Sequence, residues 1–438
     1  MSIAPNVGAV SRYLTYLRTS KGWLNAKRAL AAGLKKTPLV GNSLHHLLQR
    51  WKNHIRNIFV KDRFFQAFGL RYLGPVDGHD ERGLEHFLMR AKRLTDQGVP
   101  EVVAALSHAF PRSVVAGCST AGQIHERTLQ DRHFSVAVAS FDAVALVPAV
   151  VHVASARHSR AAAGEILAQV SRPDLRALLV LADGLSVDAS EFVRGINAAV
   201  PPGVIVTGGL AGDGPRLRRA WVMHDGRAAD RVVAAIGLAG DRVVVGHGTR
   251  AGWEPFGPER VVTRAEGATV FEFDGRPALR LYEDYLGSTA AGLPWTGLLL
   301  PVSLMTGSHT RDCVLRSVLA VDETSGAVTF AGDVPQGSRV RLMRASADRL
   351  VQGASQAGFH GQAQRAAGPV LAVAISGVGR RVALGERTEE EIEATLDALP
   401  PVTRQVGFYA YGEIGPGVDG ACVLYNQTMT LTTIGEAA

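Results

Sequence analysis

Four polar side chains that can bind a ligand lie near the C-terminal end, among residues that otherwise predict buried β-strands. Glu413, Asn426, Gln427 and Thr428 all fall within residues 407–436, GFYAYGEIGPGVDGACVLYNQTMTLTTIGE. A buried carboxylate or amide needs a hydrogen-bonding partner, because an unpaired polar group in a core costs free energy. We therefore expect these side chains either to satisfy buried backbone groups or, as a cluster, to face a ligand.

Two strands must position these side chains. The segments GFYAYGEI and ACVLYNQTMTLTTI alternate bulky residues with small or polar ones at a period of two, which is typical of strands. Between them, GPGVDG has the Gly, Pro and Asp of a turn. The pattern predicts a single β-hairpin that closes the fold.

Two glycine-rich segments provide further candidate binding residues. GCSTAG contains Cys118, Ser119 and Thr120, and TGGLAGDG contains Gly208, Gly209 and Asp213; each follows a predicted strand. Free backbone N–H groups in such turns can cradle a carboxylate or a phosphate. The alternative is a tight turn that merely needs glycine. Neither segment fits a phosphate loop or a dinucleotide-binding motif, so nucleotide binding is not predicted.

Arg380 is the candidate cation for an anionic ligand. It follows the apolar strand VLAVAISGVG and precedes a helix that begins ERTEEEIE. Its guanidinium can grip a carboxylate at two points, but an ion pair with Glu386 or with the acidic first turn of the helix is an alternative. Thr388 and Glu391 have the spacing of a capping box, which gives that threonine a structural role.

Support for catalysis or for a metal is weak. Cys118 lies in an elbow-like turn with His125 nearby, but no third group orients this pair, and a small buried thiol is the alternative. The three cysteines lack the paired spacing of a zinc or redox site. We assign no catalytic residue, no cofactor and no metal.

Composition and charge restrict the class of protein. A chain of 438 residues with 46% hydrophobic and 20% charged residues is a folded protein long enough for about three domains. No run of about 18 apolar residues predicts a membrane span, and MSIAPNVGAVSRYL lacks the pattern of a signal peptide. We expect a cytoplasmic protein with no membrane partner.

The net charge of +7 is unevenly distributed. Residues 1–97 carry 7 Lys and 10 Arg against 6 acidic residues, which gives +11, whereas the other 341 residues carry 30 Arg against 34 acidic residues, which gives −4. Every lysine lies at or before Lys92. The basic part can bind phosphate backbones, but a solvated helical face is the more common explanation, so nucleic acid is not an expected partner.

The order of predicted elements indicates a mixed α/β fold in two sheet-and-helix halves. Residues 1–97 form a basic, mainly helical segment, and helices and strands alternate from about Val99. Strands include 134–142 and 177–185, helices include 101–110, 160–171, 189–200 and 277–287, and strands predominate after Trp221. We place domain boundaries at 97/98 and 287/288.

Several motifs of residues 98–436 resemble the FIST family. GCSTAG, TGGLAGDG, GWEPFG and DGRPALRLYEDYLG resemble its N-terminal half, and FAGDVPQGSRVRLMRA, GVGRRVALGERTEEEIE and the predicted hairpin resemble its C-terminal half. The resemblance implies a cytoplasmic sensory module whose partners are a small-molecule ligand, such as an amino acid, and a signalling protein. Gly377 and Tyr425 stand where the family usually has Cys and His.

Residues 1–94 resemble an internal piece of 1-deoxy-D-xylulose-5-phosphate synthase, a thiamine-diphosphate enzyme. The resemblance rests on NVGAVSRYLTYLRTS and FFQAFGLRYLGPVDGHD, in which Asp77 and His79 match the DGHD loop of the family. The chain lacks the motif that holds the diphosphate and magnesium, and the glutamate that activates the cofactor. Because the family's chemistry runs through that cofactor, we expect no catalysis by this segment.

Together these observations favour a binding protein whose ligand lies between the two halves, near the glycine turns, Arg380 and the hairpin. The alternatives are a non-catalytic or partial synthase homologue fused to a FIST module, acyl chemistry at Cys118, and a scaffold whose basic segment binds acidic partners.

Overall fold

The computed structural model describes residues 99–438 apart from residues 112, 132, 225 and 306–313. The predictions for the basic segment, residues 1–97, therefore lie outside the described residues. None of the helices among the described residues is long and apolar enough to cross a membrane.

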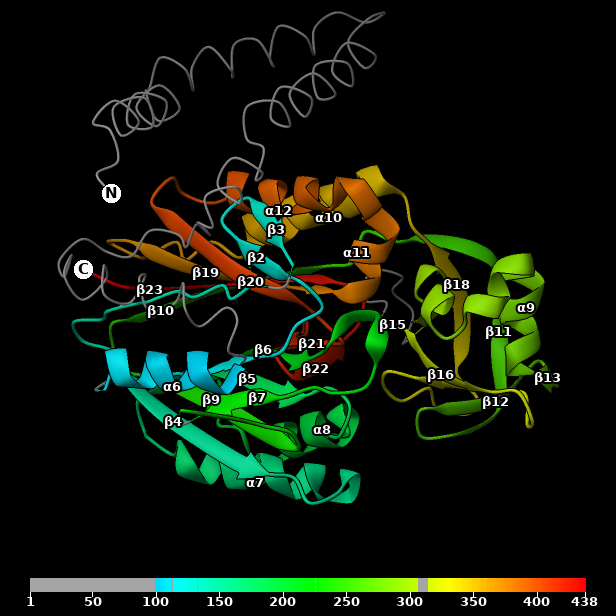
Figure 1. The fold of residues 1–438 in the computed structure, drawn as a ribbon, viewed down its shortest axis with the longest axis horizontal. Helices are drawn as coiled ribbons and strands as arrows, with labels where there is room; N and C mark the ends of the chain where they lie inside the picture. Colours follow the sequence, from blue (N-terminus) through cyan, green and yellow to red (C-terminus); the bar gives the residue numbers. More distant parts are fainter. Residues whose placement is uncertain (1–98, 112, 132, 225, 306–313) are drawn as a thin grey trace, which may run out of the picture. The chain divides into compact units, whose positions relative to one another are not determined.

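Two six-stranded sheets form the centre of the fold (Figure 1). The β5 sheet has the order β22-β21-β6-β5-β9-β4, and the β19 sheet has the order β10-β23-β19-β20-β2-β3. In each sheet one central pair, β5–β6 or β19–β20, is parallel, and the other pairs are antiparallel. The strands of the β5 sheet are β4 (Ala145–His152), β5 (Leu175–Asp183), β6 (Ile205–Ala211), β9 (Val232–Ala239), β21 (Glu413–Pro416) and β22 (Cys422–Tyr425). Those of the β19 sheet are β2 (Gln123–His125), β3 (Thr128–Gln130), β10 (Val243–Arg250), β19 (Val370–Gly377), β20 (Thr403–Ala410) and β23 (Met429–Glu436).

The two sheets stack face to face between two layers of helices. The hydroxyls of Thr207 on β6 and Thr432 on β23 lie 2.6 Å apart across the interface between the sheets. Helices α7 (Ser159–Gln169) and α8 (Ala189–Ala199) cover the outer face of the β5 sheet, and α10 (Ala347–His360) and α12 (Thr388–Asp397) cover that of the β19 sheet (Figure 1). β5 is buried on both faces, as its almost continuous apolar sequence predicts.

A separate lobe of eight strands follows β10 in the chain (Figure 1). Its core includes Phe273, Tyr282 and Phe330, and α9 (Ala278–Leu286) packs against it. The strands are β11 (Glu254–Glu266), β12 (Thr269–Phe273), β13 (Arg276–Pro277), β14 (Val302–Leu304), β15 (Val314–Arg316), β16 (Val318–Asp322), β17 (Ala327–Phe330) and β18 (Arg339–Arg344).

A small sheet and two further helices complete the described fold. The strands β1 (Gly117–Cys118), β7 (Val222–His224) and β8 (Arg227–Ala229) form the sheet, and α6 (Val99–Ala109) packs against Met223. Helix α11 (Val378–Leu384) follows β19, and the 3-10 helix η4 (Trp295–Leu299) precedes β14. The structure confirms the mixed α/β class and the predicted helices that correspond to α6, α7, α8 and α9.

The two predicted halves share both central sheets. β2, β3 and β10, which precede residue 287, pair within the β19 sheet, and β21 and β22, which follow it, extend the β5 sheet. Residues 134–142, predicted as a strand, pair with no other strand in the described part of the chain, and that prediction was wrong.

The segment predicted as a single C-terminal hairpin contains four strands. Only the two strands at its tip pair with each other as a hairpin. β21 and β22 pair with each other in the β5 sheet, while β20 and β23 lie in the β19 sheet on either side of β19. The chain passes between the sheets at residues 411–413 and again at residues 425–428, which we call the crossover. Gln427 has a positive φ of 62°, which interrupts the second strand at this point. The polar residues singled out by the sequence therefore lie where the chain changes sheets.

Candidate functional site

Glu413 is the buried carboxylate of the crossover. Its side chain is fully buried, and Thr428 donates to its Oε2 from the backbone N–H at 2.9 Å and from the hydroxyl at 2.6 Å. Burial raises the pKa of Glu413 to about 8, although the hydrogen bonds from Thr428 oppose the shift. The carboxyl therefore keeps a proton at neutral pH. Its Oε1 has no hydrogen-bond partner among the residues that the structure describes.

Gln427 presents a second unpaired oxygen. Its side-chain Nε2 donates to Ser317 Oγ at 2.8 Å and to the Leu298 carbonyl at 3.3 Å, which fixes the amide. Its Oε1 is buried and, within the described part of the chain, accepts no hydrogen bond. A glutamine with positive φ is uncommon, and such backbone strain is often found at functional sites.

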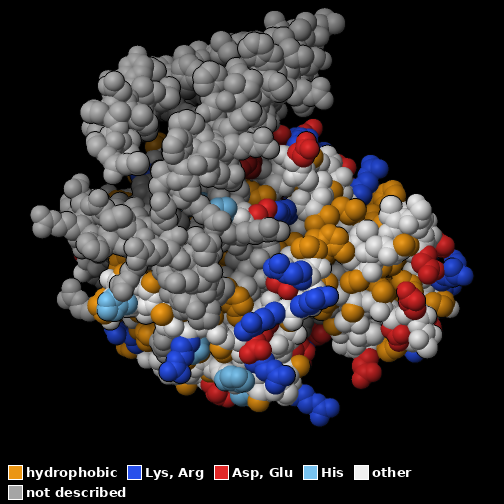
Figure 2. Space-filling view, viewed as in Figure 1, with side chains coloured by type: hydrophobic (Ala, Val, Ile, Leu, Met, Phe, Trp, Pro, Cys, Tyr) orange, Lys and Arg blue, Asp and Glu red, His pale blue; other side chains and the backbone are white. Residues whose placement is uncertain are grey.

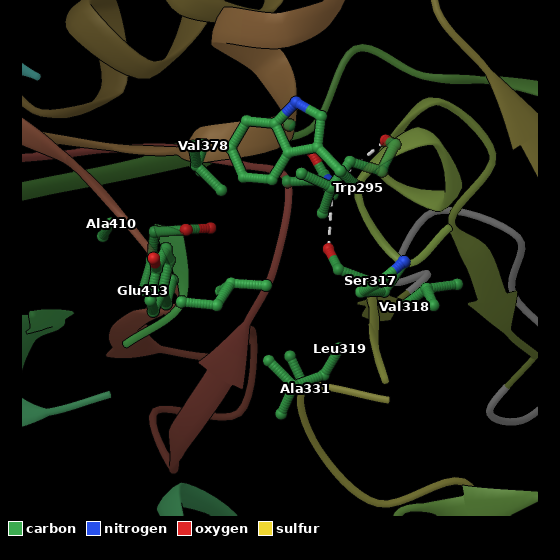
Figure 3. A pocket seen from close by; sticks show the side chains of 15 residues that line it. Trp295, Ser317, Val318, Leu319, Ala331, Val378, Ala410 and Glu413 are labelled. Carbon is green, nitrogen blue, oxygen red and sulfur yellow. Dashed lines mark hydrogen bonds between the residues drawn. The ribbon is translucent and has the colours of Figure 1, made fainter. Parts of the chain in front are cut away.

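Glu413 and Gln427 line the same pocket (Figure 3). Figure 3 shows Glu413 and Ala410 on one side, facing Leu319 and Ala331 across the pocket, with Trp295 above them. The cavity volume is about 30 Å³, and since one water needs about 10–15 Å³ on this measure, it holds about two waters or one small polar head group. The full lining is Leu217, Pro294, Trp295, Leu298, Ser317, Val318, Leu319, Ala331, Gly377, Val378, Gly379, Ala410, Tyr411, Glu413 and Gln427.

The central sandwich and the lobe both contribute to this pocket. Glu413 comes from β21, Val378 from α11, Trp295 from η4 and Val318 from β16. Neighbouring polar atoms are already paired: the lobe's buried Arg316 donates to backbone carbonyls, including that of Leu424 at 3.0 Å. The pocket residues therefore carry two buried oxygens without a described partner, the Gln427 amide oxygen and the Glu413 carboxyl oxygen, which becomes a second acceptor only when Glu413 is ionised.

A chain of side-chain hydrogen bonds extends from Glu413 into the interface between the sheets. Successive donor–acceptor distances run from 2.6 to 3.3 Å. The imidazole in the chain, His247, has its pKa lowered to about 4 by burial and is therefore neutral at pH 7. The members after Glu413 are, in order, Thr428, Thr430, Thr249, His247, Thr432 and Thr207.

Arg380, predicted to grip a ligand carboxylate, is engaged in an internal ion pair. It is fully buried, and its Nε and Nη2 donate to Glu391 Oε2 at 3.0 and 2.7 Å. Nη2 also donates to the Leu350 carbonyl at 2.8 Å, and Nη1 donates to that of Ala251. Tyr409 donates to the other oxygen of Glu391 at 2.6 Å. The position of Arg380 matches the alternative in which it pairs with the acidic first turn of the next helix.

The predicted capping box does not form. Thr388 Oγ1 donates to the Gly385 carbonyl at 2.6 Å and caps no N–H group of α12, while Glu391 turns inward to Arg380. A buried guanidinium without a carboxylate would cost more free energy than the loss of a helix cap, because water can hydrogen-bond the exposed N–H groups in place of the cap.

The glycine turns lie at a different cavity, of about 1150 Å³, which Cys118, Ser119, Thr120 and Asp213 line. Thr120 Oγ1 accepts from Gln123 Nε2 at 2.7 Å, and Asp213 Oδ1 accepts from the Tyr411 hydroxyl, also at 2.7 Å. Ser119 Oγ accepts from the Trp221 N–H at 3.0 Å. Burial raises the pKa of Cys118 to about 12, so the thiol is neutral and a poor nucleophile.

The remaining predicted residues pack beside these cavities. A Cβ on Gly208 would meet the Val180 backbone, and one on Gly209 would meet Ile375, so both glycines allow close packing. Asn426 is buried, and its Nδ2 donates to the Tyr425 carbonyl at 2.9 Å. Of the ten predicted binding residues, the structure thus brings Glu413 and Gln427 to one pocket and four others to the larger cavity.

Sequence reasoning missed the apolar side of the pocket. Trp295, Leu319 and Ala331 carry no polar signal, and they reach Glu413 only through the placement of the lobe. In the residues that the structure describes, no group of three or more His, Cys, Asp and Glu is arranged to hold a metal ion.

The sandwich and the lobe form a two-part module with a pocket lined by residues of both parts. Residues 92–276 match the FIST N domain and residues 278–416 match the FIST C domain. The chain belongs to the FIST family, whose domains are sensory modules for small ligands.

Residues 1–105 match the family model of 1-deoxy-D-xylulose-5-phosphate synthase. Proteins of that name from Symbiobacterium thermophilum and Lysinibacillus sphaericus are 37% identical over 111 residues and 43% identical over 94 residues. These alignments cover 25% and 22% of this chain, and 17% and 15% of the two relatives. The chain therefore spans less than a fifth of the length of these relatives.

Proposed function

We propose that this chain is a cytoplasmic sensory module whose small pocket binds the protonated amino group of a metabolite such as an amino acid. The observation that carries the proposal is that Glu413 and Gln427 line one pocket, and that the buried Oε1 of each has no hydrogen-bond partner among the described residues. With Glu413 ionised, both oxygens are acceptors in an apolar cavity and favour a ligand that donates hydrogen bonds, because an unmatched acceptor costs about 1–3 kcal/mol.

The size and walls of the pocket fit an ammonium head group. A volume of about 30 Å³ holds the head group and leaves the rest of the ligand at the mouth. The indole of Trp295 forms one wall, and an aromatic ring near a cation adds about 0.5–2 kcal/mol. Ionisation of Glu413 would supply the counter-charge, so a cationic ligand should displace the proton that this carboxyl otherwise holds at pH 7.

Ligand binding at this pocket can change how the sandwich and the lobe are arranged. The lobe supplies Val318, Leu319 and Ala331, and the sandwich supplies Glu413 and Val378. A ligand held by both parts stabilises the arrangement in which they meet, which shifts the conformational population and can be read by a signalling partner.

Isothermal titration calorimetry of the full chain tests the proposal. Amino acids and small amines are compared with the same molecules lacking the amino group, in buffers of different ionisation enthalpy. We expect binding only when the amine is present, with proton release near pH 7. Glu413→Gln should weaken binding at least about tenfold, the effect of losing about 1.4 kcal/mol of charge-assisted hydrogen bonding.

Asp419→Asn is the matched control. Asp419 is exposed in the turn of the same β21–β22 hairpin, so the substitution removes one negative charge without touching the pocket. Equal affinity of wild type and Glu413→Gln for every amine, or equal binding of the deaminated analogues, would disprove amine recognition at this pocket.

The match of residues 1–105 supports a second candidate function. In it, the chain is a non-catalytic or partial homologue of 1-deoxy-D-xylulose-5-phosphate synthase fused to a FIST module. Binding of thiamine diphosphate by the full chain tests this function.

A further inference from the structure

The larger cavity lies between the inward faces of the two central sheets. Its volume of about 1150 Å³ exceeds the roughly 300–1,000 Å³ of common small-molecule sites. Leu179 and Ile236 project from the β5 sheet, and Val373 and Phe408 project from the β19 sheet. Among the described residues, the cavity shares no lining residue with the pocket at Glu413. It is an independent, mainly apolar site.

Apolar side chains at this cavity remain partly open to solvent. Residues 134–141 run along it without pairing to any described strand, and Val136 and Val138 are 39% and 49% exposed. Leu179, Ile236 and Val373 are only partly buried, although they lie between two sheets. Contiguous exposed apolar surface of this kind favours an apolar ligand.

One end of the cavity is positively charged. Asp213 Oδ2 accepts the backbone N–H groups of Arg218 and Arg219, each at 3.1 Å, which fixes this turn. Arg216 is the arginine that pairs with Asp213, at 3.7 Å. The side chains of Arg218 and Arg219 line the cavity, are exposed and form no ion pair with a described carboxylate. Figure 2 shows basic and acidic side chains interspersed near the middle of the viewed face, beside apolar side chains.

The geometry points to a binding site for a single-chain amphipathic anion, such as a long-chain fatty acid, in this cavity. The acyl chain lies between the sheets against Leu179, Ile236, Val373 and Phe408, and the carboxylate pairs with Arg218 and Arg219. An apolar cavity lined by two guanidinium groups that pair with no described carboxylate is complementary to this ligand in both polarity and charge.

Fluorescence titration of the full chain with cis-parinaric acid tests the site. We expect saturable binding of one molecule per chain, reversed by hexadecanoate but at least tenfold more weakly by hexadecanol or hexadecylamine. In the series decanoate, dodecanoate and tetradecanoate, each added methylene should tighten binding up to about fourfold, equivalent to about 0.8 kcal/mol. Glu413→Gln should leave this binding unchanged, which separates the site from the small pocket.

Matched variants locate the ligand. The double substitution Arg218→Gln with Arg219→Gln should weaken binding about tenfold, whereas Arg227→Gln, an exposed arginine of β8 outside the cavity, should have no effect. Val373→Phe narrows the cavity where the acyl chain lies and should weaken binding. Ile236→Phe does the same from the other sheet, and circular dichroism verifies that each variant is folded.

Three results would overturn the proposal. The first is the absence of saturable binding. The second is equal displacement by the acid and the alcohol together with unchanged affinity in the arginine variants. The third is a concentration-dependent dimer that hexadecanoate does not dissociate, which would assign this surface to a second copy of the chain.

Discussion

At the scale of single residues, burial has opposite meanings for Arg380 and Glu413. Each is fully buried, but Arg380 has a carboxylate and two carbonyls as acceptors. Glu413 has one oxygen paired twice and the other without a described partner. A buried charged group whose hydrogen bonds are all satisfied has a structural role, because removing either member of its ion pair leaves an uncompensated charge. A buried carboxyl group with an oxygen that lacks a described partner is a candidate for ligand binding.

The raised pKa of Glu413 makes a prediction about stability. The folded carboxyl has a pKa of about 8, against an ordinary value of 4.5, so between these values the folded chain holds a proton that the unfolded chain has lost. Its contribution to stability is therefore fully present below about pH 4.5 and is lost as the pH rises through 8. We expect the free energy of unfolding, measured in urea, to fall between pH 6.5 and 8.

The prediction covers only pH 6.5 to 8 because, below pH 6.5, titration of His247 makes the free energy of unfolding rise with pH. Burial lowers the pKa of His247 from 6.5 to about 4, so between these values the unfolded chain holds a proton that the folded chain has lost. The contribution of His247 to stability therefore rises with pH over that range and is complete by about pH 6.5. Glu413→Gln cannot titrate and should flatten the slope between pH 6.5 and 8, while Asp419→Asn should keep it. A wild-type slope that survives in Glu413→Gln would show that another group is responsible.

At the scale of elements, the close approach of two helices positions the β5 sheet. A Cβ on Gly195 of α8 would lie 2.3 Å from the Arg160 carbonyl and 2.7 Å from Ala163 Cβ, both on α7. On α7 itself, a Cβ on Gly164 would meet nothing within 4 Å. Gly195 therefore permits the close packing of the two helices, whereas packing places no constraint on the residue at position 164.

Alanine substitutions at these two positions form a matched pair. Gly195→Ala should destabilise the fold by about 1–3 kcal/mol, because the clash is with backbone and cannot be relieved by a rotamer change. Gly164→Ala should stabilise it by about 0.5–1 kcal/mol through the helix propensity of alanine. Urea unfolding measures both, and equal effects of the two substitutions would contradict the predicted close contact.

At the scale of the whole molecule, the chain joins a FIST module to a segment that matches another family. The FIST models match residues 92–276 and 278–416, and the synthase model matches residues 1–105. The matched synthase segment contains no Gly-Asp-Gly to Asn-Asn motif. That motif holds the thiamine diphosphate and magnesium in the synthase family which the segment resembles.

Calorimetry of the full chain with thiamine diphosphate and Mg²⁺ tests the synthase-related function. We expect no heat of binding, because residues 1–105 contain no sequence that resembles the diphosphate-binding motif of the synthase family. The intact synthase from Symbiobacterium thermophilum, to which the segment is similar, is the positive control. Stoichiometric binding by this chain would contradict this prediction and favour the enzyme hypothesis.

The sequence alone determined the mixed α/β class and most of the helices, because apolar periodicity and glycine positions are local properties. It also identified Glu413 and Gln427, since polar residues among strand-forming neighbours require partners. The tertiary structure decided what those partners are. Pairing between strands distant in sequence split the predicted hairpin between two sheets, brought Trp295 and Leu319 to Glu413, and assigned Arg380 to Glu391. Such contacts depend on register and on the stacking of the sheets, which no local pattern encodes.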